Sequence, residues 1–178
     1  MSGPVEVRFE AREALAAIEK VRRTGRDGLP LMRDCARIMH DGVEENFAKE
    51  GRPKWLQLAP STIRNRRRRG TWPGKILQGR GRLVTSIQEK ADSHNAIVGT
   101  NVVYARILRM GGTIRHGARE RVLHFKGRKF AKPSKASHGM KAQGKAYTTR
   151  IPPRPFLQVQ PSDLRRITET ARRYLIGR

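Results

Sequence analysis

The stretch Pro60–Ile87 reads PSTIRNRRRRGTWPGKILQGRGRLVTSI and combines two kinds of pattern. Four consecutive arginines, Arg66–Arg69, suit a solvated surface or a polyanionic partner. The residues after them alternate basic and apolar side chains, and Leu83 and Ile87 are four apart, as residues on one face of a helix are. The stretch therefore predicts one cationic surface of a larger folded protein.

The charge around this stretch is strongly segregated. The chain has 178 residues and a net charge of +24. Residues 1–51 hold 9 Lys and Arg against 10 Asp and Glu, whereas residues 52–90 and 111–150 each hold 11 against 1. Two blocks of +10 predict a polyanionic partner or a negative neighbouring surface, with binding that weakens as salt rises.

The size and composition bound the domain organisation. A chain of 178 residues is long enough for one domain with a real core, or one domain with an extended arm. Hydrophobic residues make up only 37%, so part of the chain contributes little to a core. We expect a single domain over 1–178 that contains an extended basic loop or arm over 113–150.

Periodicity predicts the elements of this domain. Apolar residues at helical spacing indicate helices, and the second of them carries the stripe Leu31, Cys35, Ile38/Met39, Val43 and Phe47. The helices are expected over 11–23, 30–49, from 60 to about 70, 77–90, 102–110 and 161–176, and strands over 5–9 and 95–100. On the helix over 102–110, Val103, Ile107 and Met110 share one face.

The segment 113–150 differs from the rest. RVLHF (121–125) and AYTTRI (146–151) are expected to form two strands of one hairpin, and the Lys- and Gly-rich residues 126–145 between them a long mobile loop. The predicted fold class is α+β, with helices packed on a small, mostly antiparallel sheet and a long basic loop or β-hairpin arm. Its core is expected to contain Leu83, Ile87, Ile97, Val98 and Tyr104.

The residues that carry chemistry are sparse. The single cysteine, Cys35, lies on the stripe of a helix, and the five histidines form no metal-ligating pair. Asp41, Glu44 and Glu45 follow His40 in the pattern of a solvated helix face. We predict no enzyme, and no catalytic, cofactor-binding or metal-ligating residue. The N-terminus lacks the apolar run of a signal peptide or a membrane span.

Two groups of basic residues are candidates for partner binding. Aromatic residues are 6% of the chain, too few to favour stacking of single-stranded bases, so any contact with DNA is expected at phosphates and without sequence preference. The candidates for contact with DNA or an acidic partner are Arg64, Arg66, Arg67, Arg68, Arg69, Lys126, Arg128, Lys129 and Lys132.

Four clusters occur in an order and spacing that resemble the phage virion morphogenesis family, which includes Mu-like G proteins and tail-completion proteins of P2-like phages. The resemblance covers roughly residues 30–176. The clusters are WLQLAPSTI (55–63), KILQGRGRLVTSI (75–87), IVGTNVVYARI (97–107) followed by MGG (110–112), and IPPRPFLQV (151–159). Family members often carry a His-Gln-Phe-Gly-Gly-like sequence where this chain has Leu108, Arg109 and Met110 before its glycines.

The resemblance implies a structural protein of the tailed-phage virion that acts at the head–tail junction or the upper end of the tail. It implies a homo-oligomeric ring, a hexamer or a dodecamer, beside neck, connector or tail-tube proteins and passing genomic DNA, with assembly in the host cytoplasm and no membrane. The candidate interface residues are Trp55, Met110, Arg154 and Phe156.

Three questions stay open at this point. Arg154, between Pro153 and Pro155, either docks against a neighbouring subunit or pairs with an acid of its own subunit. The whole chain is alternatively a DNA-binding packaging or assembly factor without sequence preference. A third class is an assembly chaperone that is absent from the finished particle.

Overall fold

The fold belongs to the α+β class, as the periodicity predicted. A computed structural model describes residues 12–25 and 27–176, and the strand expected over 5–9 lies outside these residues. The chain forms two compact units, of which the first comprises residues 1–110 and 152–178 and the second is Gly111–Ile151. The second unit is thus inserted in the sequence between the end of one helix and a proline-rich segment.

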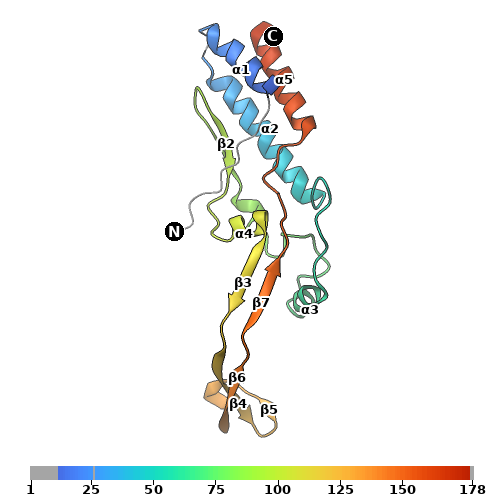
Figure 1. Ribbon diagram of the computed structural model, residues 1–178, viewed down its shortest axis with the longest axis vertical. Coiled ribbons are helices and arrows are strands. Elements are labelled where there is room, and N and C mark those ends of the chain that lie inside the picture. The colour runs from blue at the N-terminus through green and yellow to red at the C-terminus, as the bar shows by residue number, and fades with distance from the viewer. Residues whose placement is uncertain (1–11, 26, 177–178) are drawn as a thin grey trace. The chain divides into compact units, whose positions relative to one another are not determined.

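Three helices form the main layer of the first unit (Figure 1). They are α1 (Arg12–Arg23), α2 (Leu29–Ala48) and α5 (Pro161–Ile176), and α5 packs against both others. All three were predicted to within one or two residues. Leu31, Cys35, Ile38, Val43 and Phe47 are buried along α2, which confirms the predicted stripe.

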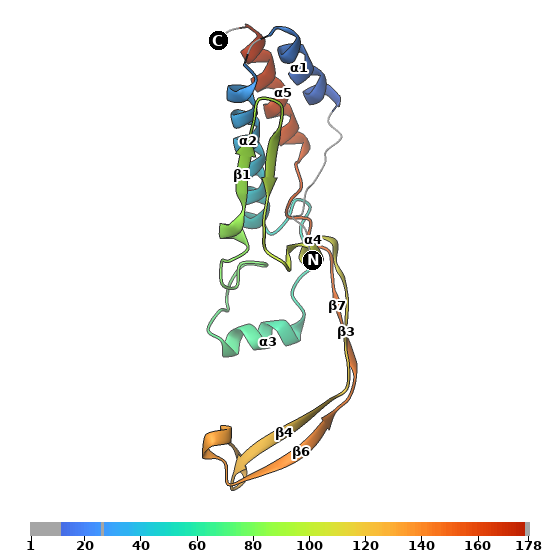
Figure 2. The same cartoon turned by 90° about the vertical axis from the view of Figure 1, so that its left-hand side faces the viewer.

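A two-stranded antiparallel sheet packs on α2. It consists of β1 (Gln88–Ala91) and β2 (Ala96–Gly99), with Gln88 opposite Gly99. Figure 2 shows β1 beside α2. The strand expected over 95–100 is confirmed as β2.

The helix expected over 77–90 is wrong. The chain instead makes a 3-10 turn, η1 (Val84–Ser86), and then enters β1. Leu77 and Gly81 have φ of 62° and 73°, which an α-helix excludes. The Ser86 hydroxyl and the Ser86 backbone N–H both donate to the Leu83 carbonyl, at 2.7 and 3.3 Å, which closes a 3-10 turn in place of an α-helical one. Leu83 and Ile87 are nevertheless buried, as predicted.

Two shorter helices complete the first unit. The helix predicted from Pro60 is confirmed as α3 (Pro60–Arg68), and Gly70, at φ 67°, follows its end. The helix predicted over 102–110 is shorter and is α4 (Ala105–Met110).

The predicted inward face of α4 is wrong. Val102 and Ala105 are buried, whereas Val103 is 76% exposed and Met110 is 61% exposed. The Thr100 hydroxyl accepts a hydrogen bond from the backbone N–H of Val102 at 3.2 Å, so Val102 belongs to a turn that precedes α4. The helix then begins at Ala105, which is buried. Ile97 and Tyr104, expected in the core, are also exposed, and Val98 packs partly buried against it.

The core of the first unit has two clusters joined by α2. The N-terminal half of α2 packs with α1 and α5 around Val21, Leu31 and Ala171. Its C-terminal half contributes Val43 and Phe47 to a second cluster, which also holds Trp55, Ile76, Leu83, Ile87, Val102, Ala105, Phe156 and Leu157. One 20-residue helix therefore supports both halves.

The second unit is an antiparallel ribbon. Strands β3 (Gly112–His116) and β7 (Tyr147–Ile151) pair, with His116 opposite Tyr147. Beyond them β4 (Arg119–Lys126) pairs with β6 (His138–Gly144), and Figure 2 shows these two strands side by side.

The predicted pairing within this unit is wrong. RVLHF lies in β4 and AYTTRI contains β7, but β4 pairs with β6 and with β5 (Lys129–Phe130) instead of with β7. The segment 126–145, expected to be a loop, thus contains β5, all of β6 and the 3-10 turn η2 (Pro133–Lys135). Gly127, at φ 59°, permits the tight turn between β4 and β5 that starts this pairing.

Candidate interaction surfaces

Helix α3 presents the arginine block of the first unit. Arg64, Arg67, Arg68 and Arg69 are exposed and Arg66 is half-buried. The Arg66 guanidinium donates through Nη1 to the Lys75 carbonyl at 3.0 Å. Within residues 12–25 and 27–176 none of these five arginines forms a salt bridge. The predicted cationic surface is therefore present and uncompensated.

The second basic group lies around the β4–β5 hairpin. Lys126 and Lys129 are register partners, and Arg128 lies in the turn between them. These three residues and Lys132 are exposed. The structure thus brings the four together in the second unit, and the five arginines together in the first.

The second unit also carries an apolar face that sequence analysis missed. Directly opposed residues of antiparallel strands share a face, so Leu123, opposite Met140, and Phe125, opposite Phe130, lie on one side of the ribbon. The Phe125 and Phe130 rings stack with centroids 4.8 Å apart. Phe130 is 76% exposed and Met140 53%. The period-two pattern of apolar residues in β4 could have indicated this face. The many lysines of residues 126–145 favoured the prediction of a loop instead.

The four candidate interface residues have different environments. Phe156 is fully buried and Trp55 is 5% exposed, and both pack against Phe47 with ring centroids 5.3 and 6.0 Å away. These two side chains fill the core of their own chain, so the interface role predicted for them has no exposed surface to act through. Met110 is 61% exposed and stays a candidate.

Arg154 is a buried cation without an acidic partner. It is 5% exposed, and its Nη2 donates to the Leu56 carbonyl at 3.0 Å. Its Nε is buried without a hydrogen-bond partner, and Arg154 forms no salt bridge, among the residues that the structure describes. Burial and the nearby charge of Arg66 lower the pKa of Arg154. The described residues therefore do not support the alternative in which Arg154 pairs with an acid of its own subunit.

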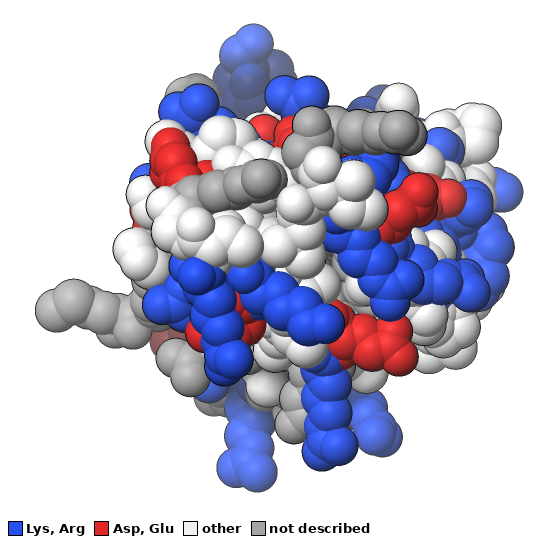
Figure 3. Space-filling model, turned by 90° about the horizontal axis from the view of Figure 1, so that it is seen from above, with Lys and Arg blue, Asp and Glu red and all other residues white. Residues whose placement is uncertain are grey.

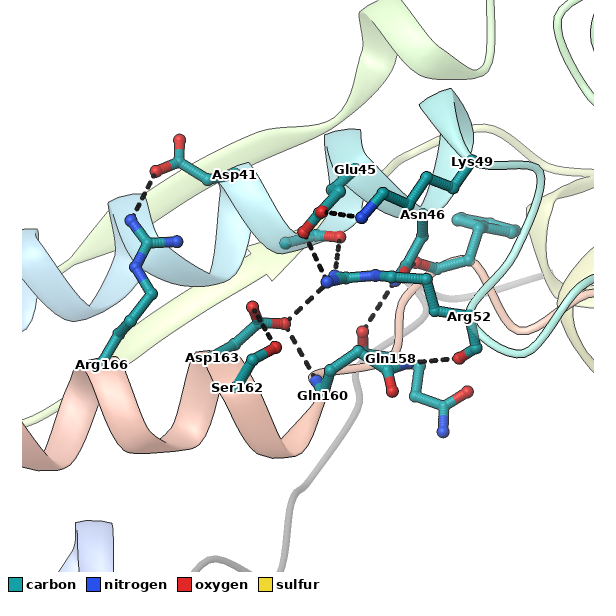
Figure 4. A network of polar contacts seen from close by, with 12 residues as sticks. Asp41, Glu45, Asn46, Lys49, Arg52, Gln158, Gln160, Ser162, Asp163 and Arg166 are labelled. Atoms are coloured by element: carbon teal, nitrogen blue, oxygen red, sulfur yellow. Dashed lines mark hydrogen bonds and ion pairs between the residues drawn. The ribbon is translucent and has the colours of Figure 1, made fainter.

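A polar network that sequence analysis also missed holds this region in place (Figure 4). Asn46 donates from its amide to the carbonyls of Phe156 and Gln158, at 3.0 and 2.8 Å. Arg52 donates from Nε to the Asn46 amide oxygen at 2.8 Å and from Nη2 to Asp163 at 3.2 Å. Helix α2, the extended residues 156–160 and the start of α5 are therefore joined by hydrogen bonds.

Sites for chemistry are scarce in the described chain. Residues 12–25 and 27–176 contain no group of three or more His, Cys, Asp or Glu that could hold a metal ion. Cys35 is buried, and desolvation together with the charge of Asp34 raises its pKa to about 11, which keeps the thiol protonated at neutral pH. No helix in the same residues is long and apolar enough to cross a bilayer.

Comparison with known proteins identifies the family. A model described as the phage virion morphogenesis family matches residues 9–176. The chain belongs to this family. It is also 31% identical over 164 residues to the "Mu-like prophage FluMu G protein 2" of Haemophilus influenzae. The alignment covers 92% of this chain and 90% of the relative. No solved structure matches the chain.

Membership of the virion morphogenesis family confirms the resemblance read from the four sequence clusters. The chain is therefore a bacteriophage virion morphogenesis protein, from a family of structural and assembly proteins and not of enzymes. Of the four sequence clusters, KILQGRGRLVTSI (75–87) contains the buried residues Ile76, Leu83 and Ile87, and IPPRPFLQV (151–159) contains the buried residues Phe156 and Leu157. These parts of the resemblance thus include residues that pack the core.

Proposed function

We propose that this chain is a structural component of the virion that forms a ring at the head–tail junction or at the upper end of the tail. Family membership supports a role in virion assembly. The observation that carries the ring is the second unit, a ribbon with an apolar face that the rest of that unit leaves uncovered.

The ribbon contributes subunit contacts in this proposal. A small sheet with one apolar face needs a second layer for stability, because its own strands cannot bury that face. A neighbouring copy that covers Leu123, Phe125, Phe130 and Met140 with a different surface makes a head-to-tail contact. Head-to-tail contacts form a ring when the rotation between neighbours closes. We propose six or twelve copies, with neck, connector or tail-tube proteins as neighbours.

Electron microscopy of particles produced without this protein tests the proposal. We expect filled heads and separate tails, because the component that joins them is missing. Complementation with the wild-type chain should restore joined particles. Joined, infectious particles in its absence would overturn the proposal.

The strong positive charge favours a second candidate, a DNA-binding packaging or assembly factor without sequence preference. Both basic blocks have a net charge of +10, which suits a polyanion better than a protein surface of mixed charge. Mass spectrometry of purified virions separates the candidates. A structural component is present at a fixed copy number per particle, whereas a packaging factor or an assembly chaperone is absent from finished particles.

A further inference from the structure

A basic hollow lies beside the C-terminal end of α3. It has a volume of about 350 Å³, and three of its lining residues are arginines. Thr62, Thr71 and Asn65 add hydroxyl and amide groups, and no acidic residue lines the hollow. The hollow therefore offers many hydrogen-bond donors and no negative charge. The arginines are Arg66, Arg69 and Arg80.

One of the three arginines is fixed by the backbone. Arg66 donates to the Lys75 carbonyl at 3.0 Å, and a Cβ on Gly79 would lie 3.4 Å from its Nη2. The guanidinium therefore lies against the backbone of residues 75–79. Arg69 and Arg80 are exposed and form no salt bridge within the described chain, so their guanidinium groups are available to a ligand.

The surroundings of the hollow also lack negative charge. Residues 60–82 contain eight Lys and Arg and no Asp or Glu. Arg154, 5% exposed and without an acidic partner in the described residues, is close enough to Arg66 for the charge of Arg66 to lower its pKa. A buried cation without a counterion is costly, so an anion bound nearby stabilises both arginines.

We propose that this hollow binds a backbone phosphate of double-stranded DNA, with Arg69 and Arg80 as the main ligands. Guanidinium groups bind phosphate oxygens in a planar, two-point geometry, and the exposed Arg64, Arg67 and Arg68 can meet neighbouring phosphates of the same duplex. A backbone phosphate carries the same single negative charge as a carboxylate, but a duplex presents further phosphates to the neighbouring arginines, which a lone carboxylate does not. No aromatic residue lines the hollow, so unpaired bases find nothing to stack on. This inference does not depend on the position of the protein in the virion.

Fluorescence anisotropy of a labelled DNA duplex, titrated with the full-length chain, tests the site. The test variant is Arg69→Gln with Arg80→Gln. The control is Lys54→Gln with Lys90→Gln, which removes the same charge from exposed positions that do not line the hollow. We expect the test variant to bind about tenfold more weakly than wild type and to lower the slope of log K against log salt by about 1, the value for one phosphate contact. We expect the control to lose about threefold at most.

Three results would overturn the proposal. Equal losses in the two variants would show that only total charge matters, and an absence of binding by the wild-type chain would exclude a DNA site. Poly-glutamate that binds as tightly as the duplex and distinguishes the variants in the same way would assign the hollow to an acidic protein. Circular dichroism establishes that both variants are folded, as expected for substitutions of exposed side chains.

Discussion

Gly51 shows how single positions determine the way α2 ends. The residue has φ of 100°, and its N–H donates to the Asn46 carbonyl at 2.7 Å. A Cβ at this position would lie 2.5 Å from Trp55 Cδ1 and 2.6 Å from the Pro53 carbonyl oxygen. Glycine is therefore required both by the backbone conformation and by the approach of Trp55, which is part of the core.

Gly51→Ala is expected to lower the free energy of unfolding by about 3 kcal/mol, from the left-handed backbone and the overlap with Trp55 together. Gly70→Ala is the matched control, because Gly70 follows α3 with φ of 67° and a Cβ added there would meet nothing within 4 Å. We expect Gly70→Ala to lower the free energy of unfolding by about 1 kcal/mol. Urea unfolding of the full-length variants measures both values, and equal losses would contradict the packing argument.

Arg154 illustrates a different effect at the same scale. The sequence predicts a stiff proline-rich segment around Arg154. In the structure its side chain is buried, and its hydrogen-bond partner is the Leu56 carbonyl rather than an acidic side chain. The Asn46 and Arg52 side chains hold the following residues, 156–160, through hydrogen bonds to the backbone and to Asp163. The backbone N–H of Arg154 also donates to the Leu108 carbonyl at 2.9 Å, so the segment that carries the buried cation is held at Arg154 and after it.

At the scale of elements, the ribbon of the second unit is separate from the core. Every residue of the two core clusters comes from the first unit. The ribbon is ordered by its own strand pairs and by aromatic contacts such as His116 with Tyr147, whose rings stack with centroids 4.3 Å apart. The stability of the core should therefore not depend on most of the ribbon.

Excision of the outer ribbon tests this independence. Replacing residues 117–146 by Asn-Gly joins His116 to Tyr147, which are register partners, through a two-residue turn. We expect the free energy of unfolding of the first unit to change by less than about 0.5 kcal/mol. Urea unfolding followed by tryptophan fluorescence measures it, because both tryptophans, Trp55 and Trp72, lie in the first unit. Loss of a cooperative transition would contradict the prediction.

For the whole molecule, the distribution of charge and of exposed apolar surface matters most. Figure 3 shows a face of the molecule on which acidic and basic side chains are interspersed. This agrees with the near balance of charge in residues 1–51, and the excess positive charge lies in residues 52–90 and 111–150. A chain of this kind presents a surface of mixed charge and two cationic segments to its surroundings.

The ring proposal predicts that self-assembly depends on one face of the ribbon. Met140 and Val122 are 53% and 50% exposed and lie in paired strands, but on opposite faces, because Val122 is opposite Lys141 and Leu123 is opposite Met140. We expect Met140→Ser to weaken oligomerisation about tenfold, as for a central interface residue, and Val122→Ser to leave it unchanged. Native mass spectrometry against concentration measures both. A wild-type chain that stays monomeric would contradict the ring.

Sequence patterns alone determined the long helices α1, α2 and α5, the buried stripe of α2, the two cationic blocks and the family. These features depend on local periodicity and on composition, which every window of the sequence displays. The tertiary structure decided the turn at 84–86, the exposed positions of Ile97 and Tyr104, the pairing of β4 with β6, and the burial of Arg154. Each of these depends on which distant segments come into contact. The free energy of such contacts depends on both segments, so neither segment alone predicts it.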